Sequence, residues 1–244
     1  MQVQNLPIDP IDPADPSAPA ALRVIEQHDD AGRLVQRCHM RGALLHGRLE
    51  TFGAVGHLFQ ADFVDGKMHG AMTAWTEDGK LQQQALFRNG LPHGLMQIYA
   101  NGRCISQQTM VDGVANGPTQ TYDEAGHLTA RLTLVKGGIH GPAEFFHEGV
   151  RVRKSFYRAN LLDGESLDFD AEGTVVQSCV YQANLLHGPL RRYWPDGVLM
   201  EETEYRLGRP LGAPLRYDQG GRLTGNAEAT PAILSRLQKL VRGS

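Results

Sequence analysis

The sequence predicts an all-β protein, an elongated single-layer antiparallel sheet of about eight tandem β-hairpin repeats with a short C-terminal capping helix. Three observations support this prediction. Glycine is abundant, at 28 of 244 residues. One glycine, most often preceded by histidine, recurs every 23 or 24 residues, and an aromatic ring stands five residues after each such glycine. Self-similarity at a short fixed period is the signature of a repeat protein.

These recurring glycines, here named the repeat glycines, define the register of the chain. Another glycine follows each of them after eight or nine residues, in turns such as Asp78-Gly79. The ring position is aromatic in every unit although aromatic residues make up only 7% of the chain, so the agreement is not due to chance. The repeat glycines are Gly47, Gly70, Gly94, Gly117, Gly141, Gly164, Gly188 and Gly212, and the rings are Phe52, Trp75, Tyr99, Tyr122, Phe146, Phe169, Tyr193 and Tyr217.

A third turn position lies four residues before the repeat glycine. It holds glycine in five units, including Gly90 and Gly113, and asparagine in two, at Asn160 and Asn184; the first unit has Gly42 one residue earlier. Asparagine is the usual substitute for glycine in left-handed backbone, so positive φ is expected at this position. Each unit then contains a strand of about six residues, a turn, a strand of about eight residues and a second turn.

The second strand of each unit has an apolar and a polar set of positions. In one unit the residues thirteen, nine and seven before the repeat glycine are Leu81, Ala85 and Phe87, and those ten and six before it are Gln84 and Arg88. Alternate residues of a strand share a face. We therefore expect the first set on an apolar face and the second set on a wetted face.

This pattern of glycines, rings and turns resembles the MORN repeat, in the form found in bacterial proteins of the YwqK-type antitoxin family. The resemblance covers about residues 32–225 and rests on three columns that agree throughout. It implies a twisted sheet of consecutive hairpins that binds proteins or membrane lipids and performs no catalysis. The last unit departs most from the pattern, because Leu211 replaces histidine before Gly212.

The two ends lie outside the repeat, which divides the chain into residues 1–22, 23–226 and 227–244. Residues 1–22 hold five prolines and three aspartates, a composition that predicts a disordered tail; a partner-binding strand is the alternative. In the last region Thr230 is a candidate N-cap, Pro231 a candidate first helical residue, and apolar residues up to Val241 share one face. Terminal units of repeat proteins need a cap, so a capping helix is expected there, although a membrane-surface helix has the same pattern.

Charge and hydropathy narrow the class of protein. The formal net charge is −3, whereas general polyanion binders have a strongly basic balance, so no nucleic-acid partner is expected. No stretch approaches the roughly 18 to 20 apolar residues of a membrane-spanning helix, and the first residues lack the features of a secretory leader. We expect a cytoplasmic protein, or a periplasmic one if a leader precedes this sequence; its oligomeric state stays open.

Histidine and cysteine are predicted to be structural, and no metal or other cofactor is expected. Five histidines precede repeat glycines, but equivalent residues of adjacent hairpins lie about 9 to 10 Å apart, too far for imidazoles that share one zinc ion. Each ring is expected to pack beside a turn or to bond its backbone. Cys38, Cys104 and Cys179 are predicted to fill small apolar positions. No Ser-His-acid trio recurs and nucleotide-binding motifs are absent, so the chain is predicted not to be an enzyme.

Departures from the repeat define the candidate binding site. In segment 151–158 an arginine, Arg151, replaces the apolar residue thirteen before the repeat glycine, and segment 191–194 adds two arginines and a second ring. Arginine and tryptophan are frequent at the energetic centres of interfaces, although a solvated face explains the arginines equally well. The predicted partner-binding residues are Arg151, Arg153, Lys154, Arg158, Arg191, Arg192 and Trp194, and the alternative partner-binding face bears Tyr99, Tyr122 and Phe146.

The resemblance implies a non-catalytic binding protein, an antitoxin or immunity protein that neutralises a cognate bacterial toxin or secreted effector by direct contact. The alternative is a peripheral lipid-binding or scaffold module that binds anionic lipid through Arg151, Arg153, Lys154, Arg191 and Arg192. Reversal of Arg153, Lys154 and Arg192 to glutamate is expected to weaken a complex and to leave melting unchanged, because exposed charges contribute little to stability.

Overall fold

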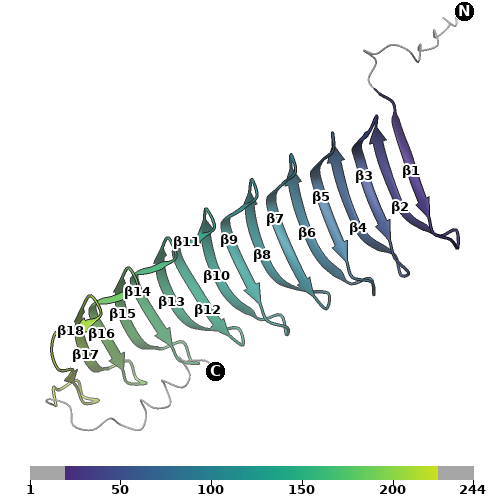
Figure 1. The fold of residues 1–244 in the computed structure, drawn as a ribbon. Helices are drawn as coiled ribbons and strands as arrows, with labels where there is room; N and C mark the ends of the chain where they lie inside the picture. Colours follow the sequence, from purple (N-terminus) through teal and green to yellow (C-terminus); the bar gives the residue numbers. More distant parts are fainter. Residues whose placement is uncertain (1–19, 225–244) are drawn as a thin grey trace, which may run out of the picture.

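Residues 20–224 form one open antiparallel sheet of 19 strands in the computed structural model, and these are the residues that the structure describes. The hairpins stack one after another along a single axis (Figure 1), and the result is an elongated single layer. The predicted all-β repeat fold is confirmed, and residues 20–224 contain no helix. The expected capping helix at 227–244 and nearly all of the expected tail lie outside the described residues.

The first strand of most units is longer than the six residues that the sequence pattern indicated, because the repeat glycine lies within the strand and not at its start, whereas the second strands, such as β6 with 8 residues, match the predicted length. The first strand of a typical unit, such as β5, has 9 residues. The strands are β1 Leu22–His28, β2 Leu34–Arg41, β3 Leu44–Phe52, β4 His57–Val64, β5 Lys67–Trp75, β6 Leu81–Arg88, β7 Leu91–Ala100, β8 Arg103–Val111, β9 Val114–Tyr122, β10 Leu128–Val135, β11 Gly138–Ile139, β12 Gly141–His147, β13 Val150–Arg158, β14 Leu161–Phe169, β15 Val175–Gln182, β16 Leu185–Tyr193, β17 Leu199–Arg206, β18 Arg209–Pro210 and β19 Leu215–Arg216.

The turns along one long edge of the sheet, upper in Figure 1 and named the upper edge, have two central residues each. In seven of them both central residues have positive φ, as at Asp65 (46°) and Gly66 (79°), which is the type I′ turn that matches strand twist. The positive φ expected at Gly90 (87°) and Asn160 (70°) is confirmed. At the first turn only Gly42 has positive φ (59°). A type II′ turn places glycine first, which explains why this glycine stands one residue early.

The turns of the opposite, lower edge account for the alternation between 23 and 24 residues. Two of them are two-residue turns, Asn101-Gly102 and Glu148-Gly149, and the corresponding intervals between repeat glycines are 23 residues long. Longer turns use a side-chain oxygen to hold the loop. The Asp170 carboxylate, for example, accepts the backbone N–H of Thr174 at 2.7 Å. Length therefore varies in the lower turns while the strands stay in register.

Six of the eight repeat glycines lie at a β-bulge close to the upper edge, namely Gly47, Gly70, Gly94, Gly117, Gly164 and Gly188. Between the pairs Gln108↔Thr119 and Met110↔Ala115, one residue of β8, Thr109, faces three residues of β9 that include Gly117. Gly117 has φ of 130°, and a Cβ at this position would lie 2.9 Å from the Cβ of Thr109. A side chain other than hydrogen therefore does not fit at Gly117. Positive φ, which seven of the eight repeat glycines share, explains why glycine recurs at this position.

A second bulge, near the lower edge, corrects one part of the predicted face pattern. Ala74 pairs with Gln83 and Trp75 pairs with Leu81, so Gln82 has no partner on β5. Directly paired residues of antiparallel strands point to the same face. Leu81 therefore shares a face with Trp75 and not with Ala85 and Phe87. The prediction that positions thirteen, nine and seven share one apolar face was wrong for position thirteen, because the extra residue reverses the alternation.

The centre of the sheet is filled by small and large residues in alternation. Ala61 pairs with Met72, which pairs in turn with Ala85, and all three are buried, with Phe59, Phe63 and Phe87 among the residues packed on them. Cys38 and Cys179 are also buried and unpaired, as the prediction of small apolar positions required. The face that carries this row is named the core face.

Two of the five histidines that precede repeat glycines, His46 and His93, hold adjacent hairpins together. The Nδ1 atom of His93 lies 3.1 Å from Oδ1 of Asp112 and 3.4 Å from its backbone N, in the turn of the next hairpin. His46 has the same relationship to Asp65, at 3.0 Å and 3.3 Å. For these two rings the prediction of a bond to turn backbone is confirmed. The last unit, with Leu211 in place of histidine, still forms its upper turn at Leu207-Gly208.

Candidate binding surface

The face opposite the core face carries all the residues of the ring column that lie in strands. Thr73 pairs with Gln84 and Trp75 pairs with Leu81, so the rings, the residues thirteen before each repeat glycine and the glutamines ten before it share one side of the sheet. We name this side the ring face. It extends over every hairpin, and neighbouring rings are two strands apart, about 9.4 to 9.8 Å.

The middle of the ring face is a row of amides bonded to tyrosine hydroxyls. Tyr99 donates to Oε1 of Gln84 at 3.0 Å, and Tyr122 donates to Oε1 of Gln120 at 2.8 Å. Gln107 donates to the Tyr122 hydroxyl at 3.1 Å. The rings are half-buried, so their edges and the amide groups remain open to a partner. Burial raises the pKa of Tyr99 above its ordinary value, and the phenol therefore stays a neutral donor near neutral pH.

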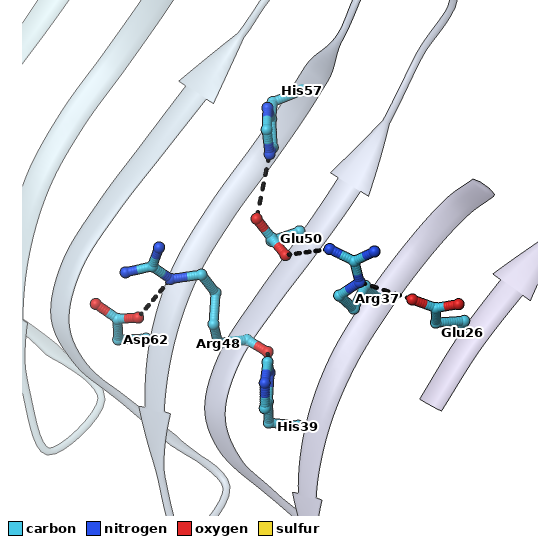
Figure 2. A network of polar contacts seen from close by, with 7 residues as sticks. All are labelled: Glu26, Arg37, His39, Arg48, Glu50, His57 and Asp62. Carbon is cyan, nitrogen blue, oxygen red and sulfur yellow. Dashed lines mark hydrogen bonds and ion pairs between the residues drawn. The ribbon is translucent and has the colours of Figure 1, made fainter. Parts of the chain in front are cut away.

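The N-terminal part of the ring face is a lattice of matched charges (Figure 2). Arg37 lies between Glu26, at 2.8 Å, and Glu50, at 3.8 Å, and the other oxygen of Glu50 is 3.2 Å from Nε2 of His57. The His57 ring also lies between Phe52 and Trp75, with centroids at 4.7 Å and 5.6 Å. These side chains hold each other in place and leave little unmatched charge.

Further along the same face, cations lie over rings. Arg131 and Arg151 both bond Glu144, at 3.2 Å and 3.1 Å. The guanidinium of Arg131 lies 5.8 Å from the centroid of Phe146, and that of Arg151 lies 4.4 Å from the centroid of Phe169. Such cation–π contacts contribute roughly 0.5 to 1 kcal/mol at exposed sites. Phe146, an alternative site residue, is thus covered in part by Arg131.

The predicted cationic site does not form a single surface. Arg153 and Lys154 are consecutive in β13 and point to opposite faces, as do Arg191 and Arg192 in β16. Arg151, Lys154 and Arg191 belong to the ring face, whereas Arg153 and Arg192 belong to the core face. Arg158 flanks an upper turn, and Trp194 begins a lower turn, where its indole N–H donates to the Tyr217 carbonyl at 3.3 Å.

Most of the predicted cations already have an acidic partner within the chain. Arg191 bonds Glu202 at 2.5 Å on the ring face, and Arg158 lies 3.5 Å from Asp163. Arg151 bonds Glu144, as described. Lys154 alone has no ion pair among residues 20–224, although Glu144 is its register partner. These distances leave partner binding at the seven positions untested.

A charged ladder on the core face was missed by the sequence analysis. Arg153 bonds Asp168, Gln177 bridges Asp168 and Arg192 at 3.3 Å each, and Arg192 bonds Glu201 at 2.8 Å. Arg216 bonds the same Glu201 at 3.0 Å. The two acids are 7% and 8% exposed. One signal could have revealed the ladder: the positions eleven before and four after the repeat glycine, Phe59 and Ala74 in one unit, hold opposite charges at Arg153 and Asp168 and again at Glu201 and Arg216.

The side chains around this ladder are held in unreactive states. Burial raises the pKa of the Cys179 thiol and raises that of the Tyr181 phenol to about 12. A thiol whose pKa is raised carries little thiolate, which is the nucleophilic form. The hydrogen bond to Asp168 raises the pKa of Arg153. The contacts of the ladder position β13 to β17 and β19 relative to one another.

Residues 20–224 hold no group of three or more His, Cys, Asp or Glu side chains that could bind a metal ion. In the same range there is no helix long and apolar enough to cross a membrane.

The fold and its two open faces define an elongated β-hairpin repeat protein. Two stretches of the chain match the family model of the MORN repeat variant, residues 68–89 and residues 186–206. The first match covers most of β5 and β6, and the second covers most of β16 and β17. The MORN repeat of the sequence analysis is thus present at two sites, whereas the antitoxin family stays a prediction. A comparison with curated protein sequences gives no match.

Proposed function

We propose that this protein is a non-catalytic binding protein of the antitoxin or immunity class, which neutralises a cognate bacterial toxin or secreted effector through its ring face. The class rests on the resemblance of the repeats to those of the YwqK-type antitoxins. The observation that supports the face is the continuous row of tyrosines and glutamines around Tyr99, Tyr122 and Gln107. Rings with a polar tip are favoured at interfaces because one side chain supplies both apolar area and a hydrogen bond.

The dimensions of the ring face suit a protein partner. The seven rings that lie in strands, two strands apart, give a row of roughly 58 Å along a straight ribbon. A standard interface buries about 800 Å² on each partner, which part of this row and the neighbouring amides can supply. Arg151 and Arg191, from the predicted cationic site, lie on the same face and extend the surface towards the C-terminal hairpins.

The lipid-binding alternative has less support. Membrane-surface binding through electrostatics needs several free cations, each contributing about 1 kcal/mol near an anionic leaflet. Of the three predicted cations on the ring face, Arg151 and Arg191 are matched by Glu144 and Glu202. Lys154 is left as the one without an ion pair in residues 20–224. We therefore favour a protein partner over a lipid surface.

The experiment is co-purification of the protein with the product of a neighbouring gene in the native host, followed by titration with variants. A Tyr99→Ser/Tyr122→Ser variant is expected to bind roughly thirtyfold more weakly, since interface anchors contribute about 2 kcal/mol or more. Tyr157→Ser, which removes a ring from the core face, is the matched control and is expected to keep its affinity. Melting of each variant separates loss of contact from loss of fold.

Three outcomes count against the proposal. In the first, the Tyr99→Ser/Tyr122→Ser variant binds the partner with wild-type affinity and Tyr157→Ser binds it more weakly, which places the binding site on the core face. Salt-sensitive binding to vesicles of anionic lipid, with no protein partner, supports the lipid module. Turnover of any substrate by the purified protein contradicts a non-catalytic role.

A further inference from the structure

A row of mostly apolar side chains crosses the upper half of the ring face. It takes one residue from each strand, as in the register pairs Leu95↔Thr109 and Pro142↔Phe156. Leu86 and Gln84 are alternate residues of β6, so the row lies on the same side of the sheet as the glutamines. From β6 to β13 the row holds threonine in two strands, β8 and β10, and in the other five it holds Leu86, Leu95, Pro118, Pro142 and Phe156. We name it the apolar row.

The apolar row is open to solvent. Leu86, Leu95 and Phe156 are 46%, 47% and 41% exposed, and both prolines are exposed as well. The next row towards the lower edge is polar, because in β6 to β9 it consists of Gln84, Gln97, Gln107 and Gln120. A continuous exposed apolar patch with a polar rim marks an interaction site. The apolar row therefore adds a second contact zone to the ring face, beside the tyrosines.

The two ends of the apolar row carry opposite charges. Lys67 is exposed in β5, one strand before the row, and Glu165 is exposed in β14, one strand after it. Neither has an ion pair within residues 20–224. Lys154 lies nearer the lower edge, in the row of the glutamines. A segment that follows the apolar row therefore meets a cation at one end and a carboxylate at the other.

The backbone beneath the apolar row favours a helix as the occupant. Each strand from β6 to β13 pairs with a neighbour on both sides. A partner strand cannot add to the sheet here, because strand addition needs an exposed sheet edge. A helix forms its backbone hydrogen bonds within itself, so it needs only side-chain contacts from the surface on which it lies.

The length of the row sets the length of the helix. Six strand intervals separate β6 from β13, which is about 28 to 29 Å. A helix rises about 1.5 Å per residue, so about 19 residues cover the row. The apolar stripe of an amphipathic helix then lies on the apolar row, and its polar flank faces the glutamine amides.

We propose that the apolar row binds an amphipathic helix of about 19 residues from the partner protein, with the acidic end of the helix beside Lys67 and the basic end beside Glu165. Asp and Glu are enriched in the first turn of helices and Lys and Arg in the last, so the helix begins over β5 and ends over β14. The inference rests on the proposed function, because it takes the ring face as the binding surface. It adds the kind of segment that binds there and its direction.

A synthetic peptide of 19 residues tests the proposal with the intact protein. Its first turn carries glutamate, its last turn carries lysine, and leucine recurs at three- and four-residue spacing among alanine and glutamine. Fluorescence anisotropy of the labelled peptide is expected to show binding to wild type, and circular dichroism is expected to show that the peptide becomes helical. Leu95→Ser/Phe156→Ser is expected to bind roughly tenfold or more weakly, since it removes two apolar anchors. Leu185→Ser removes an exposed leucine of β16 and is the matched control, with unchanged affinity.

The direction of the helix has a separate test. A second peptide with the charged ends exchanged is expected to bind wild type roughly two- to fivefold more weakly at low salt, because both ion pairs are exposed. The double variant Lys67→Glu/Glu165→Lys is expected to reverse this preference. The control Arg206→Glu changes a cation at the last upper turn and is expected to preserve it. Equal affinity of the two peptides for wild type contradicts the proposed direction.

Three results overturn the helix site. One is equal binding of the first peptide to wild type and to Leu95→Ser/Phe156→Ser. The other two come from a photoreactive p-benzoylphenylalanine introduced at Leu95 in the intact protein without peptide. Cross-links between two molecules identify a second copy as the occupant, and cross-links within one molecule identify another segment of the same chain.

The proposed function can fail separately. A native partner that binds Tyr99→Ser/Tyr122→Ser weakly and Leu95→Ser/Phe156→Ser with wild-type affinity supports the proposed function and contradicts the helix site. Binding of the peptide as described, in a protein for which no toxin is found, supports the helix site and contradicts the antitoxin class.

Discussion

Arg153 donates two hydrogen bonds to the carboxylate of Asp168, one of them 3.0 Å from Nη2 to Oδ2, on a face of the sheet where that carboxylate is only 7% exposed. The two residues lie directly opposite each other in β13 and β14. A buried carboxylate loses its hydration and needs an opposite charge to stay ionised. Arg153 therefore has a structural role in addition to any role in binding.

This relationship changes the expected result for one predicted site residue. Arg153→Met is expected to lower the free energy of unfolding by about 1 to 3 kcal/mol, because Asp168 loses its charged donor; the partial exposure of Arg153 limits the effect. Lys154→Met, the adjacent residue on the ring face, is expected to stay within about 0.5 kcal/mol of wild type. Urea denaturation measures both. Equal stabilities contradict the structural role, and the earlier expectation of unchanged melting then holds for Arg153 as it does for Lys154.

Two glycines with positive φ separate the cost of backbone strain from the cost of a clash. Gly117 and Gly102 have φ of 130° and 77°, but a Cβ meets Thr109 at 2.9 Å in the first case and nothing within 4 Å in the second. Gly102→Ala is expected to cost about 1 to 2 kcal/mol for the left-handed conformation, and Gly117→Ala about 1 to 3 kcal/mol more for overpacking. Thermal or urea unfolding compares them. Similar losses indicate that the bulge opens to admit the methyl group.

The fold was predictable because its causes are local. Positive φ in the turns and at the repeat glycines is a requirement on single residues, so it leaves glycine columns in the sequence. The second bulge was not predictable in the same way. Its extra residue, Gln82, is not of a residue type that marks a bulge, and the bulge shows only in the pairing of β5 with β6. Position thirteen was assigned to the wrong face for that reason.

The candidate site was less predictable, because partners lie on other strands. The cations at 151–158 and 191–194 are visible in the sequence, but their acids Glu144, Asp168 and Glu201 lie on neighbouring strands. Only the register brings them together, as in the pair Arg192↔Glu201. The tyrosine and glutamine row of the ring face was predictable as separate columns, whereas their placement on one side of the sheet follows from the bulge near the lower edge.

The acid stability of the sheet depends in part on an exposed carboxylate at the upper edge. The hydrogen bond from Arg88 lowers the pKa of Asp112 below its ordinary value. A group whose pKa is lowered on folding contributes stability above its unfolded-state pKa and loses it as the pH falls through its folded-state pKa. Arg88→Gln is therefore expected to raise the pKa of Asp112 and to be less stable than wild type at pH 7, with the difference vanishing in acid.

Carboxyl ¹³C titration and urea midpoints at neutral and acid pH measure these effects. Arg206→Gln is the matched control, because Arg206 flanks the last upper turn and has no ion pair within residues 20–224. It is expected to change neither the pKa of Asp112 nor the pH dependence. If the pKa of Asp112 is the same in Arg88→Gln as in wild type, Arg88 is not the cause of the lowered pKa.

An alanine in an upper turn is a position at which substitution by glycine is expected to stabilise the protein. Ala183 has φ of 48° in its type I′ turn and is exposed, so its methyl group is strained by about 1 to 2 kcal/mol. Glycine removes the strain and adds about 0.5 to 1 kcal/mol of unfolded-chain entropy, so Ala183→Gly is expected to be neutral or up to about 1 kcal/mol more stable. Ala71→Gly, at an exposed position of β5 whose φ is not positive, is expected to lose about 0.5 to 1 kcal/mol. Opposite or clearly unequal shifts of the urea midpoint in Ala183→Gly and Ala71→Gly support the type I′ geometry. Equal losses of stability mean that the turn relaxes around alanine. Glycine and asparagine then occur at these turns for a reason other than backbone conformation.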